Sequence, residues 1–165
     1  MANSRQLQKE TSTFLNKEVV AVGIFDVSLN FGERVVGSIY SGCLSNYNMK
    51  YIHDFKKYGV TPVMICAVTN SKIYLLDWEG NHDMINGRGP SRILSEFNRD
   101  EATIKNHTRG FVHHTVDLYE YEAHCKIECN LGAIHSNKKM NREVLNLLKD
   151  SGNSTEEFSM TSFLS

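Results

Sequence analysis

A strict alternation of apolar and polar residues towards the C-terminal end constrains the fold more than any other feature of the chain. From residue 119 to residue 131, aromatic or apolar residues occupy every odd position and polar residues occupy every even position. A period of two is typical of β-strands with one buried face, whereas the apolar residues of an amphipathic helix recur every three to four positions. This segment is therefore predicted to be extended.

The alternation changes parity between Leu118 and Tyr119, because the apolar residues before this point lie at even positions. A shift of one residue turns the whole apolar face of a strand to the other side, so the segment must contain either a bulge or a tight turn. We favour a turn around residues 119–122, since two strands of ordinary length then result, over 111–119 and 123–130.

The rest of the chain adds five predicted strands and several predicted helices. The strands are 19–27, 62–68, 72–78, 91–97 and 100–105, and the helices are 4–16, 48–58 and 138–150. The last helix carries an apolar face at helical spacing, which includes Met140, Val144 and Leu148. Residues 28–48 match neither period and are expected to form an insertion after the first strand. This pattern predicts an α+β fold made mostly of β-strands.

The length of 165 residues suits one domain with short extensions. We expect an N-terminal helix or extension over 1–16, one domain over 17–150 and a disordered tail over 151–165, since that tail is polar with isolated aromatic residues.

Charge and hydrophobicity exclude several classes of protein. With 18 Lys and Arg against 19 Asp and Glu, the chain lacks the basic excess of a general nucleic-acid binder. It contains neither the apolar run of a secretory signal nor a run of about 18 apolar residues that could span a bilayer. We therefore expect a cytoplasmic protein with reduced cysteines and no transmembrane segment.

Two groups of reactive side chains do not form chemical sites on this interpretation. Cys125 and Cys129 lie about 13 Å apart along a strand, whereas two thiolates on one zinc ion lie within about 4.6 Å of each other. We expect both to be small apolar core residues and predict no metal site. His113 and His114 are neighbours on a strand, so they point to opposite faces and cannot act on one substrate.

Two sequence segments resemble a known family. Residues 67–77, Ala-Val-Thr-Asn-Ser-Lys-Ile-Tyr-Leu-Leu-Asp, resemble the VT-x-x-R-[IVL]-Y hairpin of small pleckstrin-homology-like and GRAM-like proteins of bacteria. Residues 14–25 resemble the GE-x-V-x-A-x-G-x-F segment of the same group, and the resemblance extends over about 14–150. It implies a seven-stranded antiparallel barrel that a C-terminal helix caps, and a role in binding rather than catalysis.

We therefore expect a non-catalytic pleckstrin-homology-like module, without a cofactor, that binds a protein, a peptide or a lipid. The expected contact surfaces are the open edge strand, the groove beside the C-terminal helix and the insertion. The first two strands lack the basic cluster of phosphoinositide-binding members and offer only Glu33-Arg34. The candidate ligand contacts are Arg34, Lys56, Lys57, Lys72 and Arg109.

Two alternatives remain open at this point. One is a small enzyme or ligand carrier, in which a curved sheet encloses a pocket that contains one of four histidines. These are His107, His113, His114 and His124. The other is a structural subunit of a homo-oligomer that associates through Trp78 or through the aromatic residues Phe158 and Phe163 of the tail.

Overall fold

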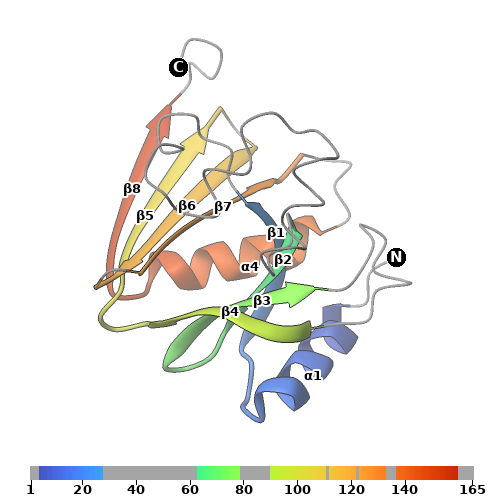
Figure 1. The fold of residues 1–165 in the computed structure, drawn as a ribbon. Coiled ribbons are helices and arrows are strands. Elements are labelled where there is room, and N and C mark those ends of the chain that lie inside the picture. Colours follow the sequence, from blue (N-terminus) through green and yellow to red (C-terminus); the bar gives the residue numbers. More distant parts are fainter. Residues whose placement is uncertain are drawn as a thin grey trace, which may run out of the picture.

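The computed structural model describes residues 4–27, 63–78, 90–110, 112–121, 123–132 and 137–159. This part of the chain has an α+β fold made mostly of strands, as predicted (Figure 1). The elements are α1 (Ser4–Leu15), β1 (Ala21–Val27), β2 (Val63–Val68), β3 (Lys72–Trp78), β4 (Pro90–Asn98), β5 (Thr103–Arg109), β6 (His113–Glu120), β7 (Ala123–Asn130), α4 (Lys138–Lys149) and β8 (Asn153–Ser159). None of the helices within these ranges is long and apolar enough to cross a membrane.

The described strands form one eight-stranded sheet in the order β4-β3-β2-β1-β7-β6-β5-β8. Neighbouring strands are antiparallel except β5 and β8, which are parallel. The strand β1 pairs with β2 over six residues but with β7 only through Asp26 and Val27. The sheet therefore divides into two halves, β1–β4 and β5–β8, that are joined at one corner.

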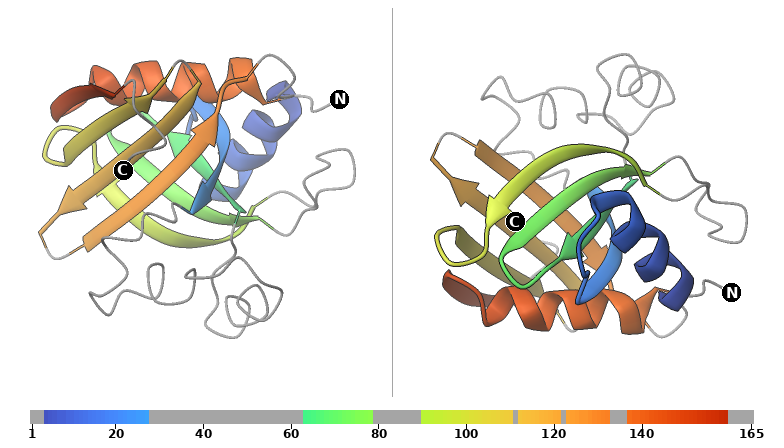
Figure 2. Two further views of the ribbon diagram at one scale, coloured as in Figure 1. Left: turned by 90° about the horizontal axis from the view of Figure 1, so that it is seen from above. Right: turned by 90° about the horizontal axis from the view of Figure 1, so that it is seen from below.

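The two halves cross one another and enclose a common apolar core (Figure 2). This core contains Phe25 and Leu75 from the first half, Leu118 and Ile127 from the second, and Val144 from α4. The helix α4 lies along one side of the space between the halves, next to β1. Its apolar face, predicted from the spacing of Met140, Val144 and Leu148, is buried as expected.

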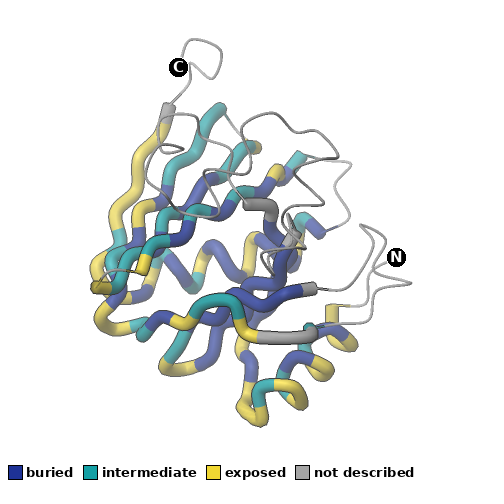
Figure 3. The backbone as a smooth tube through the Cα atoms, viewed as in Figure 1, coloured by how far each residue is buried: buried dark blue, intermediate teal, exposed yellow. Residues whose placement is uncertain are grey.

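The strands β2 and β3 are buried on both faces, because α1 covers the outer face of the first half-sheet (Figure 3). Leu7 of α1 packs in a second apolar cluster with Val22, Ile65 and Tyr74. Strands covered on both sides are expected to be continuous apolar runs rather than alternating ones. This explains the unbroken runs of β2 and β3, and it contrasts with β7, where buried and less buried residues alternate.

A side chain of α4 replaces a missing strand partner beside β1. Before Asp26, the strand β1 has no strand pair on the side of β7 among the described residues. There Asn141 accepts a hydrogen bond from the backbone N–H of Ile24 (2.8 Å) and donates one to the Ile24 carbonyl (2.9 Å). A Cβ atom on Gly23 would lie 2.6 Å from Asn141 Oδ1, so glycine is required for this close approach.

The predicted turn between the last two strands of the alternating segment is confirmed. The strand β6 ends at Glu120 and β7 begins at Ala123, and these two residues are paired. The strand predicted over 100–105 begins later, at Thr103, since Arg99 and Asp100 form a turn.

The prediction of a disordered tail over 151–165 is wrong for Asn153–Ser159, which form β8 and extend the sheet beyond β5. The predicted insertion over 28–48 and the helix over 48–58 lie outside the described residues.

Candidate functional site

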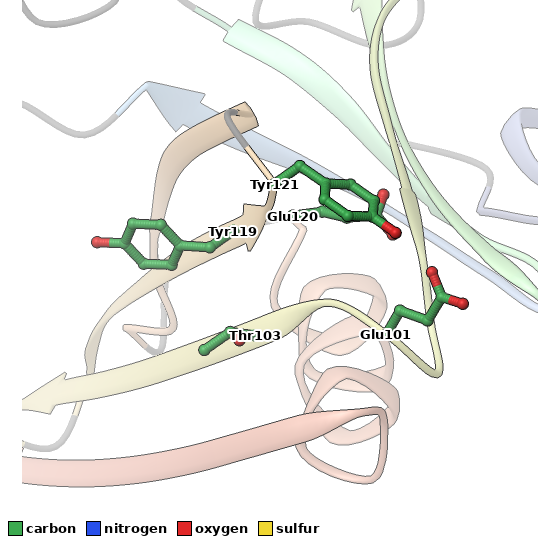
Figure 4. A pocket seen from close by; sticks show the side chains of 5 residues that line it. All are labelled: Glu101, Thr103, Tyr119, Glu120 and Tyr121. Atoms are coloured by element: carbon green, nitrogen blue, oxygen red, sulfur yellow. The ribbon is translucent and has the colours of Figure 1, made fainter.

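A cavity of about 450 Å³ opens at one end of the second half-sheet, beside the β4–β5 and β6–β7 turns. It is lined by Glu101, Thr103, Tyr119, Glu120 and Tyr121. Figure 4 shows Glu101, Glu120 and Tyr121 extending from these turns towards the same region, whereas the ring of Tyr119 points away from them. The cavity therefore combines two carboxylates with an aromatic ring.

Tyr121 has a strained backbone and an exposed ring. Its φ angle is +53°, and its exposed fraction is 94%. A bulky residue with positive φ is a conformational outlier that costs about 1–3 kcal/mol, and such strain is concentrated at functional sites. Two-residue hairpin loops of this kind normally use Asn, Asp or Gly. The tyrosine therefore does not serve the turn itself.

The two carboxylates of the cavity are held by one residue, Asn98 at the end of β4. The Asn98 backbone N–H donates to both carboxylate oxygens of Glu120 (3.1 and 3.3 Å). The Asn98 side-chain amide donates to Glu101 Oε2 (3.5 Å). The nearby Arg99 guanidinium donates instead to the Thr69 carbonyl and the Ser151 hydroxyl (2.9 and 2.8 Å). The hydrogen bonds that hold the two carboxylates therefore come from one uncharged residue, and the charge of Glu120 also acts on Lys72.

Of the predicted contacts, Lys72 lies at the start of β3, where it forms an ion pair and hydrogen bond with Glu96. This hydrogen bond raises the pKa of Lys72 above its ordinary value, and the charges of Glu96, Tyr74 and Glu120 act in the same direction. The charge of Lys72 is therefore matched by a neighbouring carboxylate.

Arg109 lies at the other end of the second half-sheet, at the last residue of β5. About 20 Å of strand separates Arg109 from Thr103 at the start of β5. Lys72 lies near this start of β5, because its strand partner Asn98 comes just before the turn that leads to Thr103. The structure therefore does not bring Lys72 and Arg109 together. Arg34, Lys56 and Lys57 lie outside the described residues.

The ring of Tyr119 is fixed by a group of polar contacts on the outer face of the second half-sheet. It stacks on the His124 ring, with 4.1 Å between centroids, and Lys105 Nζ lies 5.2 Å from its centroid. His124 Nε2 lies 2.9 Å from Asp117 Oδ1, and Lys126 Nζ lies 3.6 Å from Asp117 Oδ2. Asp117 is thus shared by His124 and Lys126, and the stacked His124 ring holds the Tyr119 ring in place at the wall of the cavity.

The two adjacent histidines of β6 have different partners, as their predicted opposite orientation requires. His113 Nε2 lies 3.0 Å from Glu128 Oε2, and His114 Nδ1 lies 3.3 Å from the Thr108 hydroxyl. Burial lowers the pKa of His114 below 6.5, and the positive charges of Lys149, His113 and Arg142 lower it further. The neutral form of His114 is therefore favoured in the folded protein.

We expect His114 to make the protein less stable in mild acid. Because its folded-state pKa is lowered, the unfolded chain takes up a proton first as the pH falls through 6.5, and stability falls until the folded-state pKa is passed. Urea unfolding at about pH 7.5 and about pH 5.5 should show a smaller loss for His114→Asn than for the wild type. Equal losses in the two proteins would contradict the assignment.

The described cysteines belong to the core, as predicted for Cys125 and Cys129. Both are buried, as is Cys66, and Cys125 Sγ lies 3.3 Å from the Ser95 hydroxyl. Burial raises the pKa of the Cys66 thiol to about 12, with a further contribution from Cys129. A thiol with this pKa is a poor nucleophile at neutral pH. Within the described ranges, no group of three or more His, Cys, Asp or Glu residues could hold a metal ion.

The residues that line the cavity were not predicted from the sequence. In the alternating segment, Tyr121 falls among the apolar positions and Glu120 among the polar, solvent-facing ones. A usable signal was present, because the predicted turn contained a tyrosine where small or polar residues are preferred. Nothing in the sequence could have joined this turn to Glu101, which comes from a separate turn.

The fold and the cavity define a small α+β protein with one bent sheet and an acidic, aromatic recess at one end. No protein-family model, curated protein or solved structure matches the chain.

Proposed function

We propose that the chain is a non-catalytic binding module with a pleckstrin-homology-like fold. Two features support this. Seven of the strands follow the order β4-β3-β2-β1-β7-β6-β5 with antiparallel neighbours, and a helix follows the seventh strand and packs beside β1. This strand order and the helix that follows it support the proposed fold. The described strands form an open sheet that runs from β4 to β8, and β8 would be an addition to the family's seven strands.

We further propose that the module binds a protein or peptide through a lysine or arginine side chain. The observation that carries this proposal is the cavity in which Glu101, Glu120 and the exposed Tyr121 ring meet. Carboxylates form charge-assisted hydrogen bonds with ammonium and guanidinium groups, and an aromatic face attracts a cation. An anionic lipid headgroup would be repelled by the same carboxylates.

The packing between the two half-sheets favours binding over an enclosed active site. The described side chains that face this space form a continuous apolar cluster, including the fully buried Phe25, Phe97 and Leu118. The cavity lies at the end of the second half-sheet, and none of the four candidate histidines lines it. A ligand carrier would instead need an open volume between the halves.

A peptide titration tests the proposal. A nonapeptide of glycine and serine with one central lysine should shift the amide resonances of residues 101–103 and 119–121, whereas the same peptide with a central glutamate should not. Tyr121→Asn should weaken lysine-peptide binding by about tenfold, because it removes the ring while asparagine tolerates positive φ. Glu101→Gln should weaken it in the same direction.

Glu143→Gln is the matched control, since it removes a carboxylate from the exposed face of α4 without touching the cavity. Binding that is absent, or that is the same in Tyr121→Asn and wild type, would refute the basic-ligand proposal.

A further inference from the structure

The carboxylate of Glu120 is bonded at the position that an arginine would need. The Asn98 backbone N–H lies at nearly equal distances from its two oxygens, 3.1 Å from Oε1 and 3.3 Å from Oε2. A donor that is shared in this way lies between the two oxygens, on the axis of the carboxylate. The two parallel N–H groups of an arginine approach a carboxylate along the same axis when they form a bidentate pair. The bidentate position of Glu120 is therefore occupied by a backbone group.

The carboxylate of Glu101 is held in a different way. Its Oε2 accepts a hydrogen bond from the Asn98 side-chain amide (3.5 Å), whereas Oε1 has no hydrogen-bond partner within the described part of the chain. An ionised carboxylate accepts at about four lone-pair positions, so both groups can still accept bonds at single oxygens. Figure 4 shows that Glu101 and Glu120 extend from different turns towards the same region. The cavity therefore offers separate single acceptors from two directions.

Lysine and arginine satisfy separate acceptors unequally. The lysine ammonium is a compact charge with three donors that can reach different acceptors, whereas the donors of the planar guanidinium form a rigid fork. An ammonium can donate to both Glu101 and Glu120, since the two line the same cavity. A guanidinium that meets an occupied bidentate position bonds through single N–H groups and loses the advantage of its fork.

The basic groups of the protein do not compete for these acceptors by direct contact. Lys72 forms its ion pair with Glu96, although the charge of Glu120 also acts on it. The Arg99 guanidinium donates to uncharged groups outside the cavity. Among the described residues, neither Glu101 nor Glu120 forms an ion pair. A ligand ammonium therefore does not have to displace a cation of the protein from either carboxylate.

We propose that the cavity selects an unmethylated lysine side chain over arginine. This inference rests on the proposed function, because it specifies which basic residue of the protein or peptide ligand enters the cavity. Asn98 sets the selectivity, since its backbone N–H excludes a bidentate pair with Glu120. Trimethylation removes every N–H donor of the ammonium but keeps its charge, so trimethyllysine would retain only its attraction to the carboxylates and the Tyr121 ring.

Three peptides test the selectivity through the amide resonances of residues 101–103 and 119–121. They are the glycine–serine nonapeptide with a central lysine and the same peptide with a central arginine or trimethyllysine. The lysine peptide should bind at least about fivefold more tightly than the others, as expected for one additional hydrogen bond. Equal or tighter binding of the arginine or trimethyllysine peptide would overturn the inference and leave the proposed function intact. Failure of all three to bind would refute the proposed function and this inference with it.

Two substitutions at Asn98 show whether its backbone N–H sets the selectivity. Asn98→Ala removes the side-chain amide but keeps the N–H, so the preference for the lysine peptide should remain. Asn98→Pro removes both groups, and β4 is an edge strand, where proline is tolerated. The bidentate position of Glu120 is then open, so the preference should shift towards the arginine peptide by about fivefold. The same preference in both variants would contradict this role of Asn98, and the comparison of the three peptides on the wild type does not depend on either variant.

Discussion

Replacing Asn141 with leucine should lower the free energy of unfolding by about 3–5 kcal/mol, because it leaves a buried N–H and a buried C=O without partners. Asn141 is fully buried and bonds both backbone groups of Ile24 at 2.8 and 2.9 Å. Next to Ile24 the strand β1 has no described strand partner on this side, so no other described group can take over the two bonds. The variant therefore loosens the contact between α4 and the corner where the two half-sheets join.

Urea unfolding provides the measurement, and Asn146→Leu is the matched control. Asn146 is on the same helix but is exposed, so its replacement should change stability by less than about 0.5 kcal/mol. Asn141→Asp should also be destabilising, since it loses the donor to the Ile24 carbonyl and adds a buried charge. A loss below about 1 kcal/mol for Asn141→Leu would mean that the Ile24 groups find other partners.

The strands β6 and β7 could be predicted closely because their sequence pattern follows directly from their surroundings. One face of β7 packs on the core and the other carries polar side chains, so the period of two gives both the strand and its orientation. The change of parity likewise predicted a turn within residues 119–122, and Tyr121 lies in that turn. In β2 and β3 the alternation is absent, because α1 covers the outer face and most positions on both faces are apolar.

The strand β8 could not be predicted because its sequence carries no apolar pattern. An edge strand whose side chains are nearly all exposed needs none, and its order comes from backbone pairing with β5. Bonds that reach distant parts of the chain are equally hidden. The Asn106 side-chain amide of β5, for example, donates to the Thr155 carbonyl of β8.

The pairing of charged side chains cannot be predicted from the sequence. The sequence does not reveal, for example, that Lys72 pairs with Glu96 across the β3–β4 ladder. The cavity depends on Asn98, which fixes Glu101 and Glu120 from different turns. Such a convergence arises only when the end of β4 comes next to the end of β6.

Gly152→Ala should lower the free energy of unfolding by about 3 kcal/mol or more, which is well above the cost of positive φ alone. Gly152 has a φ of +47° and connects α4 to β8. A Cβ atom at this position would lie 2.5 Å from the Ala102 carbonyl oxygen and 2.6 Å from that of Arg99. Both are backbone atoms in the turn before β5, so they cannot move aside without displacing the strand.

Gly110→Ala separates the steric cost of the added Cβ atom from the conformational cost of positive φ. Gly110 also has positive φ (+60°), but a Cβ there would meet nothing within 4 Å. Its cost should be limited to the conformational term of about 1–2 kcal/mol. Urea unfolding of both variants gives the difference, and amide exchange of β8 shows where it arises. In Gly152→Ala the Asn153 amide should lose its protection, since its bond to Ala102 begins the β5–β8 ladder. Equal losses of stability in the two variants would show that the turn before β5 can shift to accommodate a Cβ atom at residue 152. The position of β8 would then not depend on a glycine there.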